Sequence, residues 1–250
     1  MNEKLNFLQY LATQEQNLIT SLVNLRQDFD IFSKLDEIYR APLTAVDVPN
    51  KEAVIAQLYL FVHSEFYFSA SCMLRAHISE CLASVRKAID GALSAYGLIL
   101  EPCLMESYKT RDWTFQTIKS HIQKARKADS SKYPLAEHLI ELHEHCSQLA
   151  SHADYTGIEP RIEIQKFEQP FKEQQLLHYF DHPRDLSVYH ALFVDVLVAF
   201  YRMLYIFRPF LAQKFTISPK EWEQNLDKIG ELLIREQDRC REVLQKKGTA

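Results

Sequence analysis

The side chains that come closest to a catalytic pair are Arg184 and His190, in the segment RDLSVYH. A histidine can transfer a proton near neutral pH, and an arginine can stabilise the negative charge that develops on a phosphate during cleavage. A simpler interpretation is an ordinary surface pair at a helix N-terminus. The sequence leaves both interpretations open.

A second set of polar residues lies within Val54–Leu100, the longest apolar stretch without a proline. His77 and Glu80 are three residues apart, so their side chains can touch on a helix. Arg75 keeps its charge even when buried and therefore needs a carboxylate or several carbonyl oxygens beside it. We interpret this polar cluster as a structural ion-pair set that fixes how the helices pack, with a functional pocket as the alternative.

A row of histidines recurs every seven residues at His138, His145 and His152, with Glu141 among them. Seven residues of helix span about 10 Å, which is too far for two of these histidines alone to share one ion. Di-iron helical bundles use Glu-x-x-His, whereas the order here is His138-x-x-Glu141. We therefore predict no bound metal and no other cofactor, and the nearest metal-ligand candidates are His138, Glu141 and His145.

The spacing of Arg184 and His190 resembles the Arg-x(4–6)-His signature of the HEPN family of ribonucleases. The resemblance implies an all-helical, often dimeric protein that cuts RNA without a metal. It also implies that His190 transfers the proton and that Arg184 stabilises the charge on the phosphate.

A broader resemblance, to uncharacterised bacterial HEPN-like proteins, covers most of the middle of the chain. A helix with Arg75 and Glu80 comes first, and a segment with Ser151 and His152 follows it. In the family pattern the glutamate follows the arginine by four residues, whereas here it follows by five. The resemblance implies that these four residues gather at one end of the bundle.

The composition favours an all-α fold. The chain has 250 residues, of which 47% are hydrophobic, and its 15 Phe and 12 Tyr can fill a thick core. Only 5 Gly and 9 Pro are present, fewer than the tight turns of an all-β fold require. Apolar residues recur at three- and four-residue steps through most of the chain, as they do on amphipathic helices.

We therefore predict one domain, 1–250, built as an elongated bundle of about six helices with a short β-hairpin excursion. Its expected parts are a helix over residues 1–40, a linker over Ala41–Asn50, the central helix Val54–Leu100, helices to about Lys127 and over Tyr133–Ala153, the hairpin over 158–181, a helix over Asp185–Phe215, and a C-terminal helix and tail over 218–250.

The central helix poses a problem of size. At 1.5 Å per residue it would span roughly 70 Å, while a compact domain of this length is about 46 Å across. The bundle must therefore be elongated, or the helix must bend. Gly91 and Gly97 are the expected weak points, because glycine lowers helix stability.

Several classes of protein are disfavoured. The net charge of −4 provides no overall basic surface for nucleic acid, and none of the five cysteines forms a C-x-x-C pair. The N-terminus lacks the apolar core of a signal peptide. Asp195 and Arg202 interrupt the apolar segment Ala191–Phe207, and each would cost roughly 2.5–3.5 kcal/mol at a bilayer centre. We expect a cytoplasmic protein with no membrane contact.

The leading functional hypothesis is a helical interaction or regulatory module that self-associates, as a homodimer or larger homo-oligomer, through a long apolar helix face. The motif pattern of a nucleotide-binding, serine-hydrolase or zinc-protease site is absent from the sequence. The alternatives are a HEPN-type ribonuclease or RNA-binding toxin-like protein, with RNA as partner, and a His/Glu metal-binding bundle.

Overall fold

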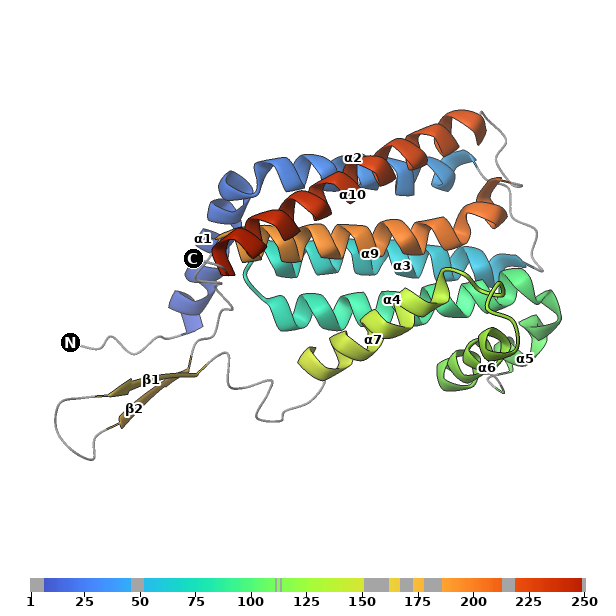
Figure 1. Cartoon of the computed structure of the whole chain (residues 1–250), viewed down its shortest axis with the longest axis horizontal. Coiled ribbons are helices and arrows are strands. Elements are labelled where there is room, and N and C mark those ends of the chain that lie inside the picture. Colours follow the sequence, from blue (N-terminus) through green and yellow to red (C-terminus); the bar gives the residue numbers. More distant parts are fainter. Residues whose placement is uncertain are drawn as a thin grey trace.

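The computed structural model describes residues 7–45, 52–110, 112, 114–150, 162–166, 173–177, 186–212 and 219–248. Within these ranges the chain is almost entirely helical, which confirms the predicted all-α class (Figure 1). The helices are α1 (Phe7–Asn24), α2 (Arg26–Ala45), α3 (Ala53–Leu74), α4 (Ile78–Leu100), the 3-10 helix η2 (Pro102–Leu104), α5 (Met105–Lys109), α6 (Phe115–Ala128), α7 (Ala136–Ala150), α9 (Leu186–Ala212) and α10 (Pro219–Gly248). Two strands, β1 (Ile162–Lys166) and β2 (Glu173–Leu177), pair antiparallel.

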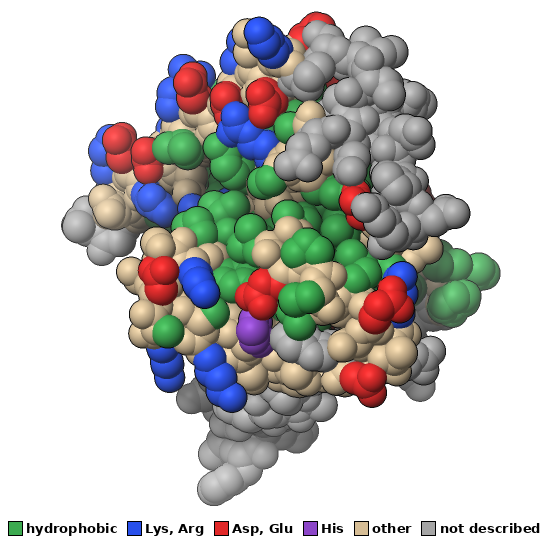
Figure 2. Space-filling model, turned by 90° about the vertical axis from the view of Figure 1, so that its right-hand side faces the viewer, with side chains coloured by type: hydrophobic (Ala, Val, Ile, Leu, Met, Phe, Trp, Pro, Cys, Tyr) green, Lys and Arg blue, Asp and Glu red, His purple; other side chains and the backbone are tan. Residues whose placement is uncertain are grey.

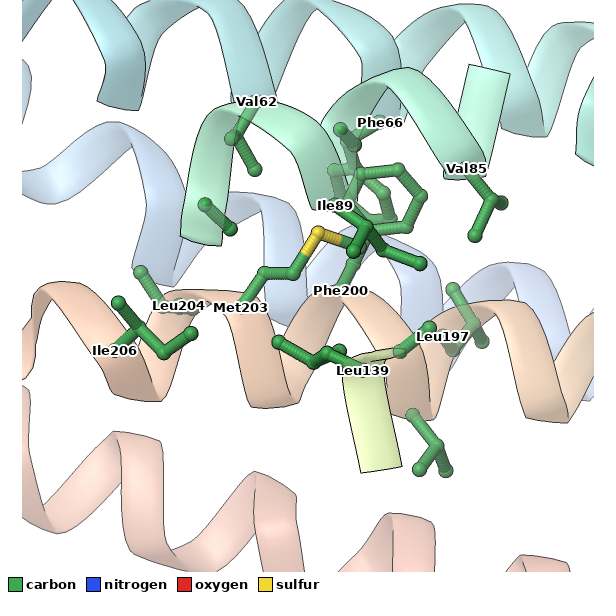
Figure 3. Close-up of a cluster of buried hydrophobic side chains, with 14 of the residues drawn as sticks. Val62, Phe66, Val85, Ile89, Leu139, Leu197, Phe200, Met203, Leu204 and Ile206 are labelled. Atoms are coloured by element: carbon green, nitrogen blue, oxygen red, sulfur yellow. The ribbon is translucent and has the colours of Figure 1, made fainter. Parts of the chain in front are cut away.

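The hydrophobic core lies where α3, α4 and α9 meet, and α2, α7 and α10 pack around these three helices (Figure 1). In Figure 3, apolar side chains from α3, α4, α7 and α9 are directed into one cluster. The rings of Phe66 and Phe200 lie with their centroids 4.9 Å apart. Burying one such side chain fully stabilises a fold by about 1.5–3 kcal/mol, so this cluster accounts for much of the driving force for folding.

The predicted central helix is wrong as a single element, because the chain reverses at Arg75–His77 and α4 packs back along α3. The reversal uses Ala76 in a left-handed conformation, with φ of 62°. The backbone N–H groups of Ala76 and His77 donate to carbonyl oxygens of Met73 and Cys72, which closes the end of α3. His77 then serves as the N-cap residue of α4. Because the segment forms two antiparallel helices, no single helix has to span roughly 70 Å.

The expected weak points at Gly91 and Gly97 are also wrong, since both residues lie buried inside α4. Gly91 serves helix packing instead. A Cβ atom there would lie 2.9 Å from Cδ1 of Phe61 on α3. The missing side chain therefore lets α3 and α4 approach closely.

The predicted helix over residues 1–40 is divided at Leu25, and α2 continues through Pro42, where a linker was expected. Proline cannot donate to the carbonyl of the residue four positions earlier, which is Ile38. The indole N–H of Trp222 donates to that carbonyl at 3.0 Å. This contact from α10 satisfies the carbonyl that Pro42 leaves without its helical partner.

Three of the four leucines of α1 are exposed, and the fourth, Leu18, packs half-buried against the core. Leu8, Leu11 and Leu22 are exposed, whereas the buried residues of α1 are the polar Asn17 and Ser21. α1 therefore contacts the bundle through Asn17, Ser21 and Leu18 rather than through a continuous apolar stripe.

The predicted helix that ends near Lys127 is divided into η2, α5 and α6. Thr114 caps α6 by accepting a hydrogen bond from the backbone N–H of Thr117, and Ile118 and Ile122 are buried. Because the three long predicted segments are each divided, nine α-helices are described instead of about six.

α9 is the one described helix that is by itself long and apolar enough to cross a membrane. About two thirds of its most apolar window is buried inside the bundle, as in the core helix of a soluble protein. Figure 1 shows α9 in the middle of the bundle, between α3 and α10.

The turn at Ala76 gives a direct test of the helix reversal. Ala76→Val should lower the free energy of unfolding by about 2–3 kcal/mol, because a β-branched residue is strained at positive φ. Ala76→Gly should change it by less than about 1 kcal/mol, since glycine adopts this conformation freely. Urea unfolding measures both. Equal costs for the two variants would contradict the left-handed turn.

Glu101, which follows α4, links that helix to α6 and to the turn before α7. Its Oε1 accepts hydrogen bonds from His121 Nε2 at 2.9 Å and from the Tyr133 hydroxyl at 2.7 Å. These hydrogen bonds lower the pKa of Glu101. A carboxyl group with a lowered pKa stabilises the fold above about pH 4.3, and this contribution is lost as the pH falls through the folded-state value.

Glu101→Gln should therefore cost about 1 kcal/mol of stability at pH 7, with the difference from the parent narrowing below about pH 4. Urea unfolding at pH 7 and pH 3.5 would test this expectation. A difference that does not depend on pH would mean that the carboxylate charge contributes nothing.

Candidate functional site

His190, the predicted proton-transfer residue, lies near the N-terminal end of α9 between α2 and α10. Its Nδ1 is 2.6 Å from Oδ2 of Asp28, whose side chain is only 1% exposed. Its Nε2 is 2.9 Å from Nη2 of Arg239. A guanidinium can only donate, so Nε2 carries no hydrogen and Nδ1–H donates to Asp28. The imidazole thus lies between a buried carboxylate and a guanidinium.

The network continues beyond the histidine. Arg239 Nε donates to Glu236 at 2.8 Å, and Gln27 Nε2 donates to the other oxygen of Glu236 at 3.2 Å. These contacts join α2, α9 and α10. The predicted partner Arg184 lies outside the described residues. The structure thus places a different arginine, Arg239, against His190, and nothing in the local sequence around residue 190 points to it.

The polar cluster at the reversal between α3 and α4 contacts α1. Arg75 Nη1 donates to Ser71 Oγ at 2.6 Å, and its Nε lies 3.6 Å from Glu15 of α1. Asn17 Nδ2 of α1 donates to the Arg75 carbonyl at 3.4 Å. The cluster therefore positions α1 on the bundle, in keeping with a structural role for Arg75.

His77 and Glu80 lie close together, as their spacing predicts. His77 Nδ1 is 4.0 Å from Glu80 Oε2, and its Nε2 is 3.4 Å from the Tyr10 hydroxyl of α1. The other two residues expected near this cluster, Ser151 and His152, lie outside the described residues.

The metal-ligand candidates on α7 do not converge. His138, Glu141 and His145 are exposed on the helix. Among the residues with described positions, no group of three or more His, Cys, Asp or Glu side chains is arranged to hold a metal ion. The buried histidine of α7 is His143, which the seven-residue pattern missed.

His143 lies behind a groove of about 610 Å³ between α3, α4 and the α5–α6 region. Its Nε2 is 2.9 Å from Asp90 Oδ1, and its ring lies 5.1 Å from that of Phe115. Asp90 and Phe115 line the groove, together with Val54, Gln57, Leu58, Phe61, Gly91, Ser94, Tyr108, Lys109 and Thr114. Figure 2 shows the end of the molecule toward α5 and α6, where hydrophobic side chains gather across the middle and charged side chains lie mostly around them.

The exposed side of α3 is the second prominent surface feature. Leu60, Phe61, Tyr67 and Phe68 are each between 40% and 54% exposed. The other exposed positions of α3 are Gln57 and Ser64, so no exposed position on this helix carries a charge. We call these residues, with the half-buried Ser71, the α3 face. The sequence did not separate this face from the buried one, because apolar residues occur all around the helix.

The cysteines offer a check on the core. Burial raises the pKa of Cys146 to about 12 and that of Cys72 and Cys240 to about 11. Burial also raises the pKa of Cys81, whereas Cys103 is exposed.

A thiol reagent at pH 8 should therefore modify one cysteine per folded chain rapidly, because the thiolate is the reactive form. The other four cysteines should react at least roughly 100-fold more slowly until the chain is unfolded in guanidinium. Cys103→Ser should abolish the rapid phase. A second rapid thiol would contradict the packing around the buried cysteines.

Comparisons of the chain with protein-family models, with curated proteins and with solved structures found no match. The HEPN-like resemblance therefore stays a prediction.

Proposed function

We propose that the protein is a helical interaction module that self-associates, and that it does so through the α3 face. The observation that carries the proposal is this exposed, uncharged helix surface in a chain whose core is otherwise closed by α2, α4 and α9. Exposed apolar surface gathered on one helix face is a common mark of a protein–protein contact. The outward-facing leucines of α1 provide a second surface of the same kind.

The size of the α3 face indicates which class of interface to expect. Four large side chains, each about half exposed, present roughly 400 Å² of apolar surface per chain. Two copies would bury about 800 Å² of it, and polar neighbours raise the total toward 1,000 Å², the range of weak or transient complexes. Association in the micromolar range is the result that such an area supports.

Sedimentation velocity from about 2 to 200 µM tests the proposal. Because the chain has a mass of 29.3 kDa, the expected result is a concentration-dependent shift from this mass toward twice it. A single 29.3 kDa species at every concentration would refute self-association.

The second candidate is a ribonuclease of the HEPN type, with cytoplasmic RNA as its partner. The observation that favours it is the contact of His190 with Asp28 on one side and Arg239 on the other. A carboxylate that orients a histidine, beside an arginine able to bind phosphate, is a useful arrangement for proton transfer on a phosphodiester. For His190 Nε2 to accept a proton, Arg239 would have to turn toward the phosphate.

The ribonuclease candidate is tested by RNA cleavage with the parent and with Arg184→Ala, His190→Ala and Arg239→Ala, each checked for folding by circular dichroism. Cleavage that is lost in the folded variants would support this candidate. No cleavage by the parent would count against it, and cleavage that persists in all three would exclude these residues as its source.

A further inference from the structure

We infer that two copies of the chain pair through antiparallel α3 helices, with a two-fold axis that passes beside Ser64. This inference rests on the proposed self-association and names its surface and geometry. It follows from how the α3 face is arranged along and around the helix.

The centre of the face is a line of three residues at seven-residue spacing: Gln57, Ser64 and Ser71. Two of them are serines, and a small side chain at the contact allows two helices to approach closely. Ser64 is exposed at the middle of this line, and its hydroxyl donates to the Phe61 carbonyl of its own helix at 2.7 Å. Because this hydrogen bond lies within its own helix, Ser64 can keep it when a second helix covers the residue.

Larger side chains flank this line on both sides. At 100° per residue, Leu60 and Tyr67 lie on one flank, and Phe61 and Phe68 lie on the other. An antiparallel two-fold at Ser64 brings Phe61 of each copy beside Phe68 of the partner, within about one residue of helix rise. It likewise brings each Leu60 beside the partner's Tyr67. Every large exposed side chain of the face then has an apolar neighbour.

Electrostatics and shape agree with a second copy as the occupant. The exposed positions of α3 carry no charge, and the one acidic residue of this helix, the half-buried Glu65, accepts a hydrogen bond from Ser84 of α4. Pairing the helix with itself therefore opposes no fully exposed like charges. The groove beside α4 is continuous with the face, since Gln57 and Phe61 line it. In the antiparallel pair, the partner's Phe68 lies next to Phe61 at the edge of this groove, where an aromatic ring has room.

Disulfide trapping tests both the surface and the direction of the pair. Single cysteines are introduced as Gln57→Cys, Ser64→Cys and Ser71→Cys in a Cys103→Ser background, which removes the exposed native thiol. Copper phenanthroline is the oxidant that accepts the two electrons as two thiols lose their hydrogens and form one S–S bond. A disulfide requires Cα atoms within about 7 Å, so only residues that face each other become linked.

The expected result is rapid linkage of Ser64→Cys with itself, and of Gln57→Cys with Ser71→Cys when the two proteins are mixed. Neither Gln57→Cys nor Ser71→Cys should link with itself. If all three link with themselves, the helices are parallel and the inference is overturned. If sedimentation shows a dimer but no α3 cysteine links, the inference fails, and self-association is the only part of the proposed function that stands. A chain that neither links nor sediments as a dimer would refute both.

Discussion

Phe68→Glu is expected to weaken self-association about 100-fold and to leave the monomer folded. Phe68 is 54% exposed and is not part of the buried core, so the monomer loses little by its replacement. In a symmetric pair the change occurs twice, and a loss of about 1.4 kcal/mol at each site multiplies to a factor of about 100. The introduced carboxylates add a desolvation cost in a contact that is otherwise uncharged.

The matched control is Ile234→Glu. Ile234 is 57% exposed on α10, away from the α3 face, so it introduces the same charge at a site of equal exposure. Sedimentation velocity of parent, test and control variants over the same concentrations gives the comparison. Equal weakening by both variants would attribute the effect to net charge rather than to the α3 face, and an unchanged Phe68→Glu protein would contradict the role of that face.

The predicted fold class succeeded because helical periodicity is a local property of the sequence. The apolar positions of α6 show this most clearly, since Ile118 and Ile122 repeat at four residues and both are buried. The periodicity gives no information on where a long helix ends when the chain can reverse without glycine or proline. Ala76 makes such a reversal in a left-handed conformation, and α4 then packs along α3.

Pro42 shows the opposite difficulty. A proline predicts the end of a helix because it removes a backbone donor, yet α2 continues to Ala45. The compensating donor is the indole of Trp222, 184 residues away from Ile38. A side chain so distant in sequence leaves no local signal, so a tertiary contact decided this boundary.

The candidate site was predictable only in part for the same reason. Sequence spacing drew attention to His190, but its two partners, Asp28 and Arg239, are 162 and 49 residues away. On α7 the regular spacing favoured exposed histidines over His143, the buried one. Repetition along a helix reveals a face, whereas a polar network between helices depends on how those helices pack.

Asp28→Ala should cost about 1–3 kcal/mol of unfolding free energy, because it leaves the Nδ1–H donor of His190 without its buried acceptor. Asp28 is 1% exposed, so water cannot readily replace the lost carboxylate. Asp28→Asn should cost only about 1 kcal/mol, since the amide oxygen can still accept from His190 Nδ1–H. Urea unfolding at pH 7 measures both values.

The ratio of these two costs also bears on the function of His190. A large cost for alanine and a small one for asparagine would mean that Asp28 serves mainly as a buried hydrogen-bond acceptor that orders α2 against α9. Costs below about 1 kcal/mol for both would mean that the contact contributes little to folding. Such a result would leave the orienting of His190 for proton transfer as the role that the contact offers to Asp28.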